Sequence, residues 1–321
     1  MDRAPVRAAI SGITGFAGQY LAQHLLDQGD QVLGFNRSGT WPQYTLSQVG
    51  AEAALFPWDV TQPALARLAY EPLRAFAPEV VYHLAAISVP EDCGPHLPTG
   101  PAAAVNVGGT AAVLEMAAGL PRPPRVVFVS TSHVYDPETA AGDPVNEEAL
   151  LKPKNGYGWS KWLAETVIGW FTGESGLDVL IARSFQHTGP RQHERMMLPQ
   201  WAQQFAAGDG RPVEVYNRST RVDLSDVRAI VRAYRLLAVA GAPGTVYNVG
   251  SGRACQTGEV LEMLRRVADP ERPIRELRPG LRLDAVADIT RLRDATGWEP
   301  LVPLEQCVAD TFDFWKQQAS E

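Results

Sequence analysis

Short apolar runs alternate with longer helical patterns along most of this 321-residue chain. The runs are rich in Val, Ile, Leu and Phe, and they read VRAAIS, QVLGFN, EAALFPW, EVVYHLAAIS, RVVFVSTS, LDVLIARS and GTVYNVG. Such runs are typical of strands that are buried on both faces, so their alternation with helices predicts βαβ units and a parallel sheet. We therefore expect an α/β fold with a doubly wound parallel sheet, whose ligands bind beyond the carboxyl ends of the strands.

The pattern of the chain changes after residue 184, where Pro and Gly mix with helical segments and clean strands become rarer. This change predicts a second, smaller α/β domain, and 321 residues are enough for two domains. We expect the larger domain to comprise 1–184 with about 221–251 and 281–290. The smaller one is expected to comprise 185–220, 252–280 and 291–321. GTVYNVG is expected to return to the first sheet.

Charge and cysteine content argue against several classes of function. A net charge of −7 does not suit nucleic acid or an anionic membrane as the main partner. Cys93, Cys255 and Cys307 are too far apart for a disulfide framework or a metal cluster, so we expect no metal site and a reducing cytoplasm. We also expect no signal peptide, and no run reaches the ~20 apolar residues of a membrane span.

A glycine-rich segment, SGITGFAGQYLAQHLLDQG, joins the first predicted strand to the first predicted helix. Gly12, Gly15 and Gly18 allow a tight turn and let a diphosphate approach the main chain, while the helix N-terminus offers N–H groups to that anion. A glycine triplet alone indicates only a tight turn, but its place between a strand and a helix predicts a Rossmann-type dinucleotide site. Neighbouring residues expected in this site are Thr14, Phe16 and Ala17.

The ends of the second and third predicted strands bear on the choice of cofactor. Sites that prefer NAD usually have Asp or Glu after the second strand, where this chain has Asn36 and Arg37. An arginine can meet a 2′-phosphate, so NADP(H) is favoured, with NAD(H) as the alternative. Asp59 and Val60 follow the third strand, and Asp59 is expected either to accept from the adenine amino group or to cap the next helix.

Tyr157 and Lys161 lie four residues apart in YGWSKWLAETVIGWF, which predicts a helix that places them one turn apart on one face. A free phenol has a pKa near ~10, and a nearby ammonium lowers it, which would suit Tyr157 for proton exchange with a carbonyl or an alcohol. The spacing alone can arise by chance. Upstream, however, RVVFVSTS ends in the hydroxyls of Ser130, Thr131 and Ser132, which can hold a substrate oxygen.

With the glycine loop first, then VSTS, then Tyr-x-x-x-Lys, the chain resembles an extended short-chain dehydrogenase/reductase over essentially its whole length. The resemblance implies that Thr131, Tyr157 and Lys161 are catalytic and that the last two also contact the cofactor. Family members commonly pair through two helices that correspond to NVGGTAAVLEMAAG and YGWSKWLAETVIGWF, so we expect a homodimer. YHLAAISV is similar to a family segment that lines the cofactor site, which adds Leu84, Ala85, Ala86 and Ser88.

Segments of the second half, among them RSFQHTGPRQ, LRPG and LRDATGWEPLVPLEQ, resemble the bacterial GDP-4-dehydro-6-deoxy-D-mannose reductases. This implies NADPH-dependent reduction of the 4-keto group of a nucleotide-linked 4-keto-6-deoxyhexose, here to GDP-D-rhamnose. The chain departs from the pattern at Gln186, where those reductases have Asn, and at Arg191, where they have Gly. It also has Val222 in place of an arginine, with Arg221 one position earlier.

The diphosphate of a sugar nucleotide needs cations, and arginines are the best candidates in the second half. Taken alone, each arginine is better explained as a solvated surface residue, and each histidine as a hydrogen-bonded structural one. The residues expected to bind substrate are Ser132, His133, Gln186, His187, Arg191, Arg221, Arg253 and Arg278.

Two alternatives to a reductase remain open from the sequence. One is a 4,6-dehydratase or epimerase on the same scaffold, and the other is a non-catalytic NADP-binding regulatory protein. Similar dehydratases place carboxylates directly after the strand-end Thr, where this chain has Ser132 and His133, so reduction without dehydration is favoured. Binding alone would not need Thr131, Tyr157 and Lys161 together.

Overall fold

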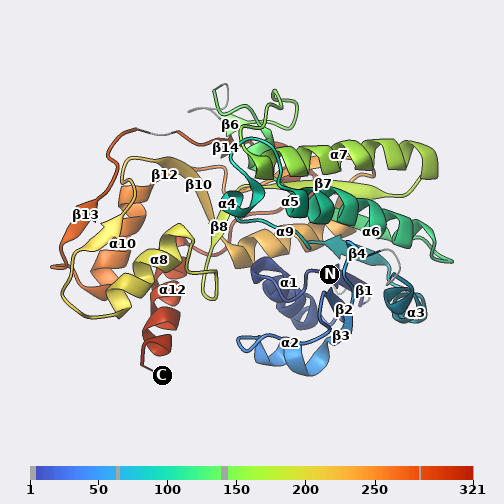
Figure 1. Ribbon diagram of the computed structural model, residues 1–321, viewed down its shortest axis with the longest axis horizontal. Helices are drawn as coiled ribbons and strands as arrows, with labels where there is room; N and C mark the ends of the chain where they lie inside the picture. Colours follow the sequence, from blue (N-terminus) through green and yellow to red (C-terminus); the bar gives the residue numbers. More distant parts are fainter. Residues whose placement is uncertain (1–4, 63–65, 139–143, 282, 321) are drawn as a thin grey trace.

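The computed structural model describes residues 5–62, 66–138, 144–281 and 283–320. It has two lobes, a larger one built on a sheet with helices on both faces and a smaller one that holds the C-terminus (Figure 1). Among the described residues, no helix combines the length and the apolar character that crossing a membrane requires. Nor do these residues bring together three or more His, Cys, Asp or Glu side chains that could hold a metal ion.

The central sheet has seven strands in the order β11-β7-β5-β4-β1-β2-β3, and every neighbouring pair is parallel. The strands are β1 (Arg7–Ser11), β2 (Gln31–Asn36), β3 (Ala54–Pro57), β4 (Val80–His83), β5 (Arg125–Thr131), β7 (Val179–Ser184) and β11 (Val246–Val249). Each lies within one of the seven apolar runs, so the predicted doubly wound sheet is confirmed. The strand order reverses between β1 and β4, which places the crevice for a ligand beyond the ends of these two strands.

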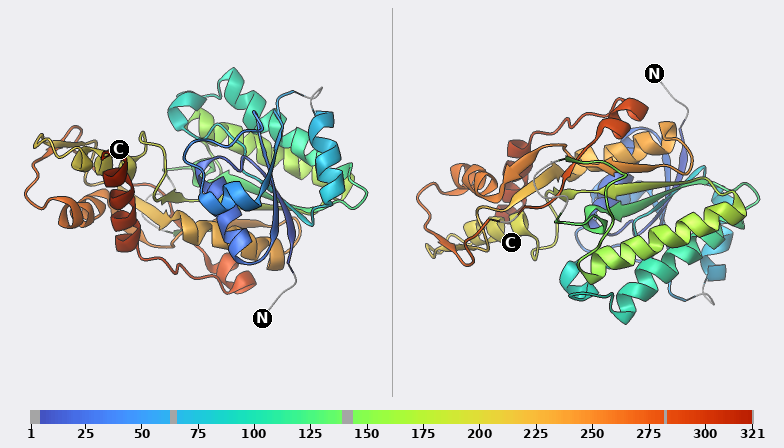
Figure 2. Two further views of the ribbon diagram at one scale, coloured as in Figure 1. Left: turned by 90° about the horizontal axis from the view of Figure 1, so that it is seen from below. Right: turned by 90° about the horizontal axis from the view of Figure 1, so that it is seen from above.

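Two apolar cores hold the helices against opposite faces of the sheet (Figure 2). One core is shared by α1 (Phe16–Asp27), α2 (Ser47–Glu52), α9 (Val227–Ala240) and α11 (Thr290–Thr296). The other is shared by α3 (Ala66–Phe76), α6 (Gly109–Ala118) and α7 (Gly156–Ser175). Because both faces are covered, the strands can be apolar on both sides, as their sequences are.

The smaller lobe has short strands and three helices around a third core. Its helices are α8 (Met197–Ala206), α10 (Thr257–Ala268) and α12 (Leu304–Gln318). One sheet has the order β12-β10-β8 and a second pairs β13 with β9. These strands are β8 (Gln186–Thr188), β9 (Val213–Val215), β10 (Arg221–Asp226), β12 (Ala254–Gln256) and β13 (Ile274–Glu276).

The strand β10 differs from the domain division expected from the sequence. The sequence predicts 221–226 in the larger domain, but β10 pairs with β8 and β12, which belong to the smaller lobe. Its apolar residues Val222 and Leu224 face the core of the smaller lobe. α11 also differs, because Leu292 lies in the core of the larger lobe although 291–321 is expected in the smaller domain. The other boundaries stay a prediction.

Short elements connect the sheet to the edge of the crevice. After β4 come α4 (Pro90–Cys93), α5 (Gly100–Ala103) and the π-helical turn η2 (Ala104–Gly108), which leads directly into α6. After β5 comes the 3₁₀ turn η3 (Ser132–Val134), and β6 (Pro144–Val145) pairs with β14 (Val286–Ala287) beyond it. Asn155 begins α7 by accepting a hydrogen bond from the Gly158 N–H at 2.9 Å.

Candidate active site

The glycine loop has the close backbone packing that a dinucleotide site requires. Gly12 has a φ of +78°, and a Cβ added to it would lie 2.6 Å from the backbone nitrogen of Ala85. A Cβ on Gly18 would overlap the carbonyl oxygen of Gly12. The loop therefore passes directly against the LAA segment after β4, and α1 begins at its end with Gly15 as the N-cap. This cradle fits a dinucleotide diphosphate at the N-terminus of α1.

The end of β2 forms a polar turn without a carboxylate. The Asn36 side chain accepts from the Gly39 N–H at 2.6 Å and donates to the Thr40 carbonyl at 2.8 Å, so it holds the turn in place. It also donates to the Thr14 hydroxyl at 3.3 Å, which joins the turn to the glycine loop. Arg37 is exposed at this turn. These positions fit an adenosine ribose with a 2′-phosphate.

Asp59 caps a turn after β3. Its carboxylate accepts from the Thr61 N–H at 3.0 Å, from the Thr61 hydroxyl at 2.7 Å and from Gln62 at 3.1 Å. These bonds hold the pKa of Asp59 below its usual value, with a smaller contribution from Arg37. The helix that Asp59 was expected to cap is preceded by 63–65, which lie outside the described residues. Asp59 retains free acceptor capacity on Oδ2, so its adenine contact stays a prediction.

The other expected cofactor residues lie along the same crevice. Val60 is buried, and its side chain occupies the space where a Cβ on Gly109 would be. Leu84, Ala85 and Ala86 are half-buried behind the glycine loop, whereas Ser88 is exposed and farther along the segment.

The start of α7 packs against the 3₁₀ turn after β5, and this contact brings the predicted catalytic residues together. A Cβ on Gly158 would overlap the carbonyl oxygen of His133, so glycine permits the close approach. The His133 ring meets the Tyr157 ring edge-on at 5.6 Å. The Thr131 hydroxyl hydrogen-bonds the Tyr157 phenol. Thr131 and Tyr157 are thus in contact, as predicted.

Burial dominates the pKa values of Tyr157 and Lys161. Burial raises the pKa of Tyr157 to about 12, and the hydrogen bond from Thr131 only partly offsets this effect. Burial lowers the pKa of Lys161 to about 7, against the opposing field of Glu165. The Tyr157 pKa is therefore raised by burial, where the sequence predicts a lowered one, and the stabilisation of the phenolate by Lys161 stays a prediction. The raised pKa keeps the phenol protonated near neutral pH.

Lys161 is buried on the inner face of α7, with 3% of its surface exposed. Its Nζ lies 4.2 Å from the centre of the Phe128 ring, which faces it from β5. The adjacent Ser160 donates to the Tyr157 carbonyl at 2.8 Å and accepts from Asn106 at 2.9 Å. Asn106 also binds both backbone groups of Ile87, so η2, α7 and the segment after β4 are joined behind the phenol.

The smaller lobe places part of the expected substrate set at the crevice. His187 stacks on Phe16 of the cofactor loop, with ring centroids 6.1 Å apart and 8° between the planes. Its Nδ1 donates to the Phe185 carbonyl at 3.0 Å, and burial lowers its pKa, so it is a neutral Nδ1–H tautomer. Gln186 donates to Asp284 at 3.2 Å, and the Asp284 N–H donates to the Arg221 carbonyl at 2.9 Å. Gln186 and Arg221 are thus joined through Asp284.

The remaining arginines of the expected set occupy separate exposed positions. Arg191 has a φ of +66° and its guanidinium lies 5.4 Å from the centre of the Phe314 ring of α12. Arg278 stacks on Tyr216 at 5.2 Å and donates to its hydroxyl at 3.0 Å. Arg253 lies in the exposed turn before β12, where its backbone binds Ser251. Their common role in holding a diphosphate stays a prediction.

The model of the NAD dependent epimerase/dehydratase family matches residues 8–250. The chain belongs to this family. It is 28% identical over 225 residues to the GDP-6-deoxy-D-mannose reductase of Pseudomonas aeruginosa, covering 68% of this chain and 74% of that protein. It is 29% identical over 239 residues to the dTDP-glucose 4,6-dehydratase of Xanthomonas campestris pv. campestris, covering 67% of each.

A solved structure of the P. aeruginosa protein RMD, complexed with NADPH, superposes with a TM-score of 0.81. It is 27% identical to this chain, and the match covers 98% of this chain and 99% of that one. The predicted Rossmann-type fold and the resemblance to extended short-chain dehydrogenase/reductases are thereby confirmed. This epimerase/dehydratase family member is an NAD(P)-dependent enzyme of the nucleotide-sugar epimerase, dehydratase and reductase group.

A buried polar network behind the catalytic residues of this family member was missed from the sequence. The Glu165 carboxylate accepts from the Ser130 hydroxyl and takes a bidentate bond from Arg183, 2.7 Å from Nη2 to Oε2. Arg183 also donates to the Tyr135 hydroxyl at 3.1 Å, and Tyr135 donates to Asn248 at 2.6 Å. One signal was available: Glu165 follows Lys161 by the same four residues that separate Lys161 from Tyr157.

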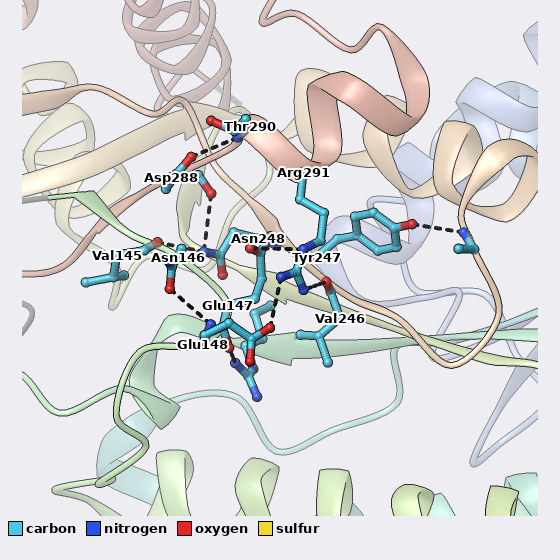
Figure 3. Close-up of polar contacts among 12 residues, drawn as sticks. Val145, Asn146, Glu147, Glu148, Val246, Tyr247, Asn248, Asp288, Thr290 and Arg291 are labelled. Atoms are coloured by element: carbon cyan, nitrogen blue, oxygen red, sulfur yellow. Dashed lines mark hydrogen bonds and ion pairs between the residues drawn. The ribbon is translucent and has the colours of Figure 1, made fainter.

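The outer end of this network reaches a groove of about 510 Å³. There the Glu147 carboxylate accepts from the Asn248 N–H at 2.8 Å and meets Arg291 at 3.5 Å (Figure 3). Arg291 also pairs with Glu148 at 2.9 Å and donates to the Val246 carbonyl at 3.1 Å. Opposite charges are matched along the groove, so we assign it a structural role in fixing 144–148 against β11 and α11.

Proposed function

We propose that this enzyme uses NADPH to reduce the 4-keto group of a nucleotide-linked 4-keto-6-deoxyhexose. The first substrate to test is GDP-4-dehydro-6-deoxy-D-mannose, whose reduction gives GDP-D-rhamnose. The similarity to the P. aeruginosa reductase supports this choice, as do the motifs of the second half.

The catalytic step needs one proton donor and one group that holds the ketone. When bound, the nicotinamide supplies the hydride. The Tyr157 O–H donates its proton to the carbonyl oxygen, which becomes the new hydroxyl, while the Thr131 hydroxyl holds that oxygen. Lys161, one turn along α7, stabilises the phenolate that remains and is placed to bind a ribose hydroxyl of the cofactor. A phenol with a raised pKa is present in the donor form that reduction requires.

The state of His133 is the observation that carries the choice of reductase over dehydratase. The Asn155 carbonyl oxygen accepts from the Gly158 N–H, so its amide nitrogen must be the group 3.2 Å from His133 Nδ1. An amide nitrogen only donates, so His133 Nδ1 is the acceptor in this hydrogen bond. The lone pair that could remove a C5 proton is thus occupied, and the position before it is Ser132.

The preference for NADPH is supported by the turn after β2. Asn36 is committed to the backbone of the turn, and Arg37 stands exposed beside it. A carboxylate at Asn36 would repel a 2′-phosphate, and this chain has none there.

The decisive experiment follows NADPH absorbance with a panel of GDP-, dTDP-, UDP- and CDP-linked 4-keto-6-deoxy sugars. Net oxidation of NADPH with one of them is the expected result. Turnover of a sugar nucleotide without net oxidation of NADPH would show a dehydratase or epimerase. Incubation of the enzyme with GDP-mannose and NADP is expected to give no 4-keto-6-deoxy product. Tight NADPH binding without turnover of any sugar would instead favour a regulatory protein.

A further inference from the structure

Glu165 occupies a position directly behind the predicted catalytic residues. It lies one turn after Lys161 on the buried face of α7, with 7% of its side chain exposed. Its carboxylate accepts from Ser130, which precedes Thr131 at the end of β5. It also receives Nε of Arg183 at 3.1 Å and Nη2 at 2.7 Å from β7. One carboxylate therefore joins the helix that carries Lys161 to both strand ends beside it.

The surroundings of Lys161 make its charge sensitive to this carboxylate. The Phe128 ring and the core behind it desolvate the ammonium, and burial lowers the pKa of Lys161 to about 7. The field of Glu165 is the largest one that opposes this effect. The titratable and charged groups that face Lys161 include Tyr157 and Glu165 on α7, Cys93 from α4, His83 from β4 and, beyond Glu165, Arg183 from β7.

We propose that Glu165 is a positioning residue that keeps Lys161 charged and aligned beside Tyr157, an inference that rests on the proposed reductase function for its catalytic consequence. The Glu165 carboxylate is held in place by three hydrogen bonds from Arg183 and one from Ser130. The guanidinium of Arg183 lies 2.7 Å from the Glu165 carboxylate and gives this buried side chain a partner of opposite charge. Only the charged form of Lys161 supplies the positive charge that stabilises the phenolate.

The direction in which loss of Glu165 changes the Lys161 pKa follows from the sign of its charge. Removing the negative charge of Glu165 makes the charged form of Lys161 less stable, so the Lys161 pKa moves further down. Lys161 then loses its proton at a lower pH, and the basic limb of the pH–rate profile moves down with it. Below the pKa of the variant, Lys161 is charged in both proteins, and their activities converge.

The first test measures Lys161 directly and needs no substrate. The chain has only four lysines, Lys152, Lys154, Lys161 and Lys316, so selective ¹³C labelling of lysine gives a spectrum that a Lys161→Arg variant can assign. In the full-length protein, Lys161 is expected to titrate well below the other three. Glu165→Gln is expected to lower its pKa by about one unit, the shift of a neighbouring opposite charge. An unchanged Lys161 titration in this variant overturns the proposal.

Two further variants separate electrostatics from damage to the fold. Glu174→Gln removes the same charge from an exposed position of the same helix and is expected to leave the Lys161 titration unchanged. Glu165→Gln leaves Arg183 buried without its carboxylate, so the double variant Glu165→Gln/Arg183→Gln serves if the single one fails to fold. Its Lys161 pKa is also expected to fall. Glu165→Asp keeps the negative charge, so its Lys161 pKa should fall less than in Glu165→Gln. A fall of the same size in both variants would contradict the proposal.

The second test uses turnover of the keto sugar. In Glu165→Gln, the basic limb of kcat/KM is expected to move about one unit lower, with a loss of about tenfold at pH values above both limbs. A uniform loss at every pH would indicate a merely structural role and would overturn the proposal. If the unmodified enzyme turns over no keto sugar, the proposed function fails, and the lysine titration still decides the role of Glu165.

Discussion

Removing the Tyr157 hydroxyl is expected to impair the proton-transfer step without impairing NADPH binding. Its phenol contacts Thr131 at the crevice, while the glycine loop that would hold the diphosphate belongs to a different strand end. Tyr157→Phe keeps the ring against His133 and removes only the O–H. We expect kcat to fall by ~10²–10⁴, the usual contribution of a positioned acid, while NADPH still binds. Steady-state rates and a fluorescence titration of NADPH check this, and an unchanged kcat would assign the proton to another donor.

Lys161 makes stability depend on pH in a direction that can be stated in advance. Its pKa is about 7 in the folded protein, below the ordinary lysine value, so between these two values the unfolded chain binds more protons. The free energy of unfolding therefore gains a contribution that rises with pH across this window, by at most ~1.4 kcal/mol per unit. Lys161→Met lacks this contribution.

The test compares urea unfolding of the two proteins from pH 7 to pH 10. The stability of Lys161→Met minus that of the unmodified protein is expected to decrease steadily as the pH rises. A difference that does not vary with pH would show that Lys161 titrates like an exposed lysine.

Arg37 is predicted to distinguish the two nicotinamide cofactors. Arg37→Ala is expected to weaken NADPH by up to ~1.5–3 kcal/mol, the worth of a charge-assisted hydrogen bond, with the lower end favoured because the side chain is exposed. NADH lacks the 2′-phosphate, so its affinity should hardly change. Isothermal titration with both cofactors gives the comparison, and equal losses would remove Arg37 from the site.

The close backbone packing of the glycine loop was predictable from the sequence, and contacts between side chains far apart along the chain were not. Gly12 and Gly18 were found because their spacing has one physical use after a strand. Glu165 and Asn155 were missed because their roles come from partners far along the chain. Ser130 and Arg183 meet Glu165 only after β5 and β7 pair, and His133 meets Asn155 only after η3 packs on α7.

At the scale of elements, the long buried strands were predictable and the short ones were not. All seven strands of the central sheet lie in apolar runs, because both faces of that sheet are covered. The three strands β8, β9 and β12 have three residues each, and QHT and ACQ show no alternation that could mark them. β8 and β12 form because both pair with β10, and β9 forms because it pairs with β13, so each depends on a tertiary contact.

The same substitution at two glycines is expected to change stability in opposite directions. Gly18→Ala would force a Cβ against the Gly12 carbonyl and the backbone of Ile13 at the start of α1. We expect a cost of ~1–3 kcal/mol and weaker NADPH binding, because the glycine loop must move. Gly173→Ala lies on α7 with no atom within 4 Å of the new Cβ, and it should stabilise the protein by roughly 0.5–1 kcal/mol. Thermal unfolding of both variants checks the signs.

At the scale of the whole molecule, the crevice is bounded by contacts between the lobes. Phe16 stacks on His187, and the Tyr20 hydroxyl donates to the Pro190 carbonyl at 3.0 Å. On the other side, Arg195 makes a bidentate ion pair with Asp92 of α4 at 3.1 Å for each bond. One lobe therefore contains the expected cofactor and catalytic residues, and the other contains most of the expected substrate residues, with these contacts joining the two.

The outer face of α7 bears the last prediction, the homodimer. Along it, Trp159, Leu163, Thr166 and Trp170 recur at helical spacing, opposite the buried face that carries Ala164. Trp170 is 69% exposed, which is unusual for so large an apolar side chain. α6 lies beside α7 on the same side of the sheet, so a twofold axis there would bury four helices in one contact (Figure 1).

Trp170→Glu places a charge in the middle of that proposed contact. A dimer would bury this carboxylate without a partner of opposite charge, which is energetically unfavourable. The variant is therefore expected to sediment as a monomer, while the unmodified chain sediments as a dimer. Leu301→Glu is the matched control, because Leu301 is 65% exposed in the smaller lobe and its charge should leave the dimer intact. The α7 interface is excluded if the unmodified chain has a monomer mass at every concentration, or if both variants remain dimers.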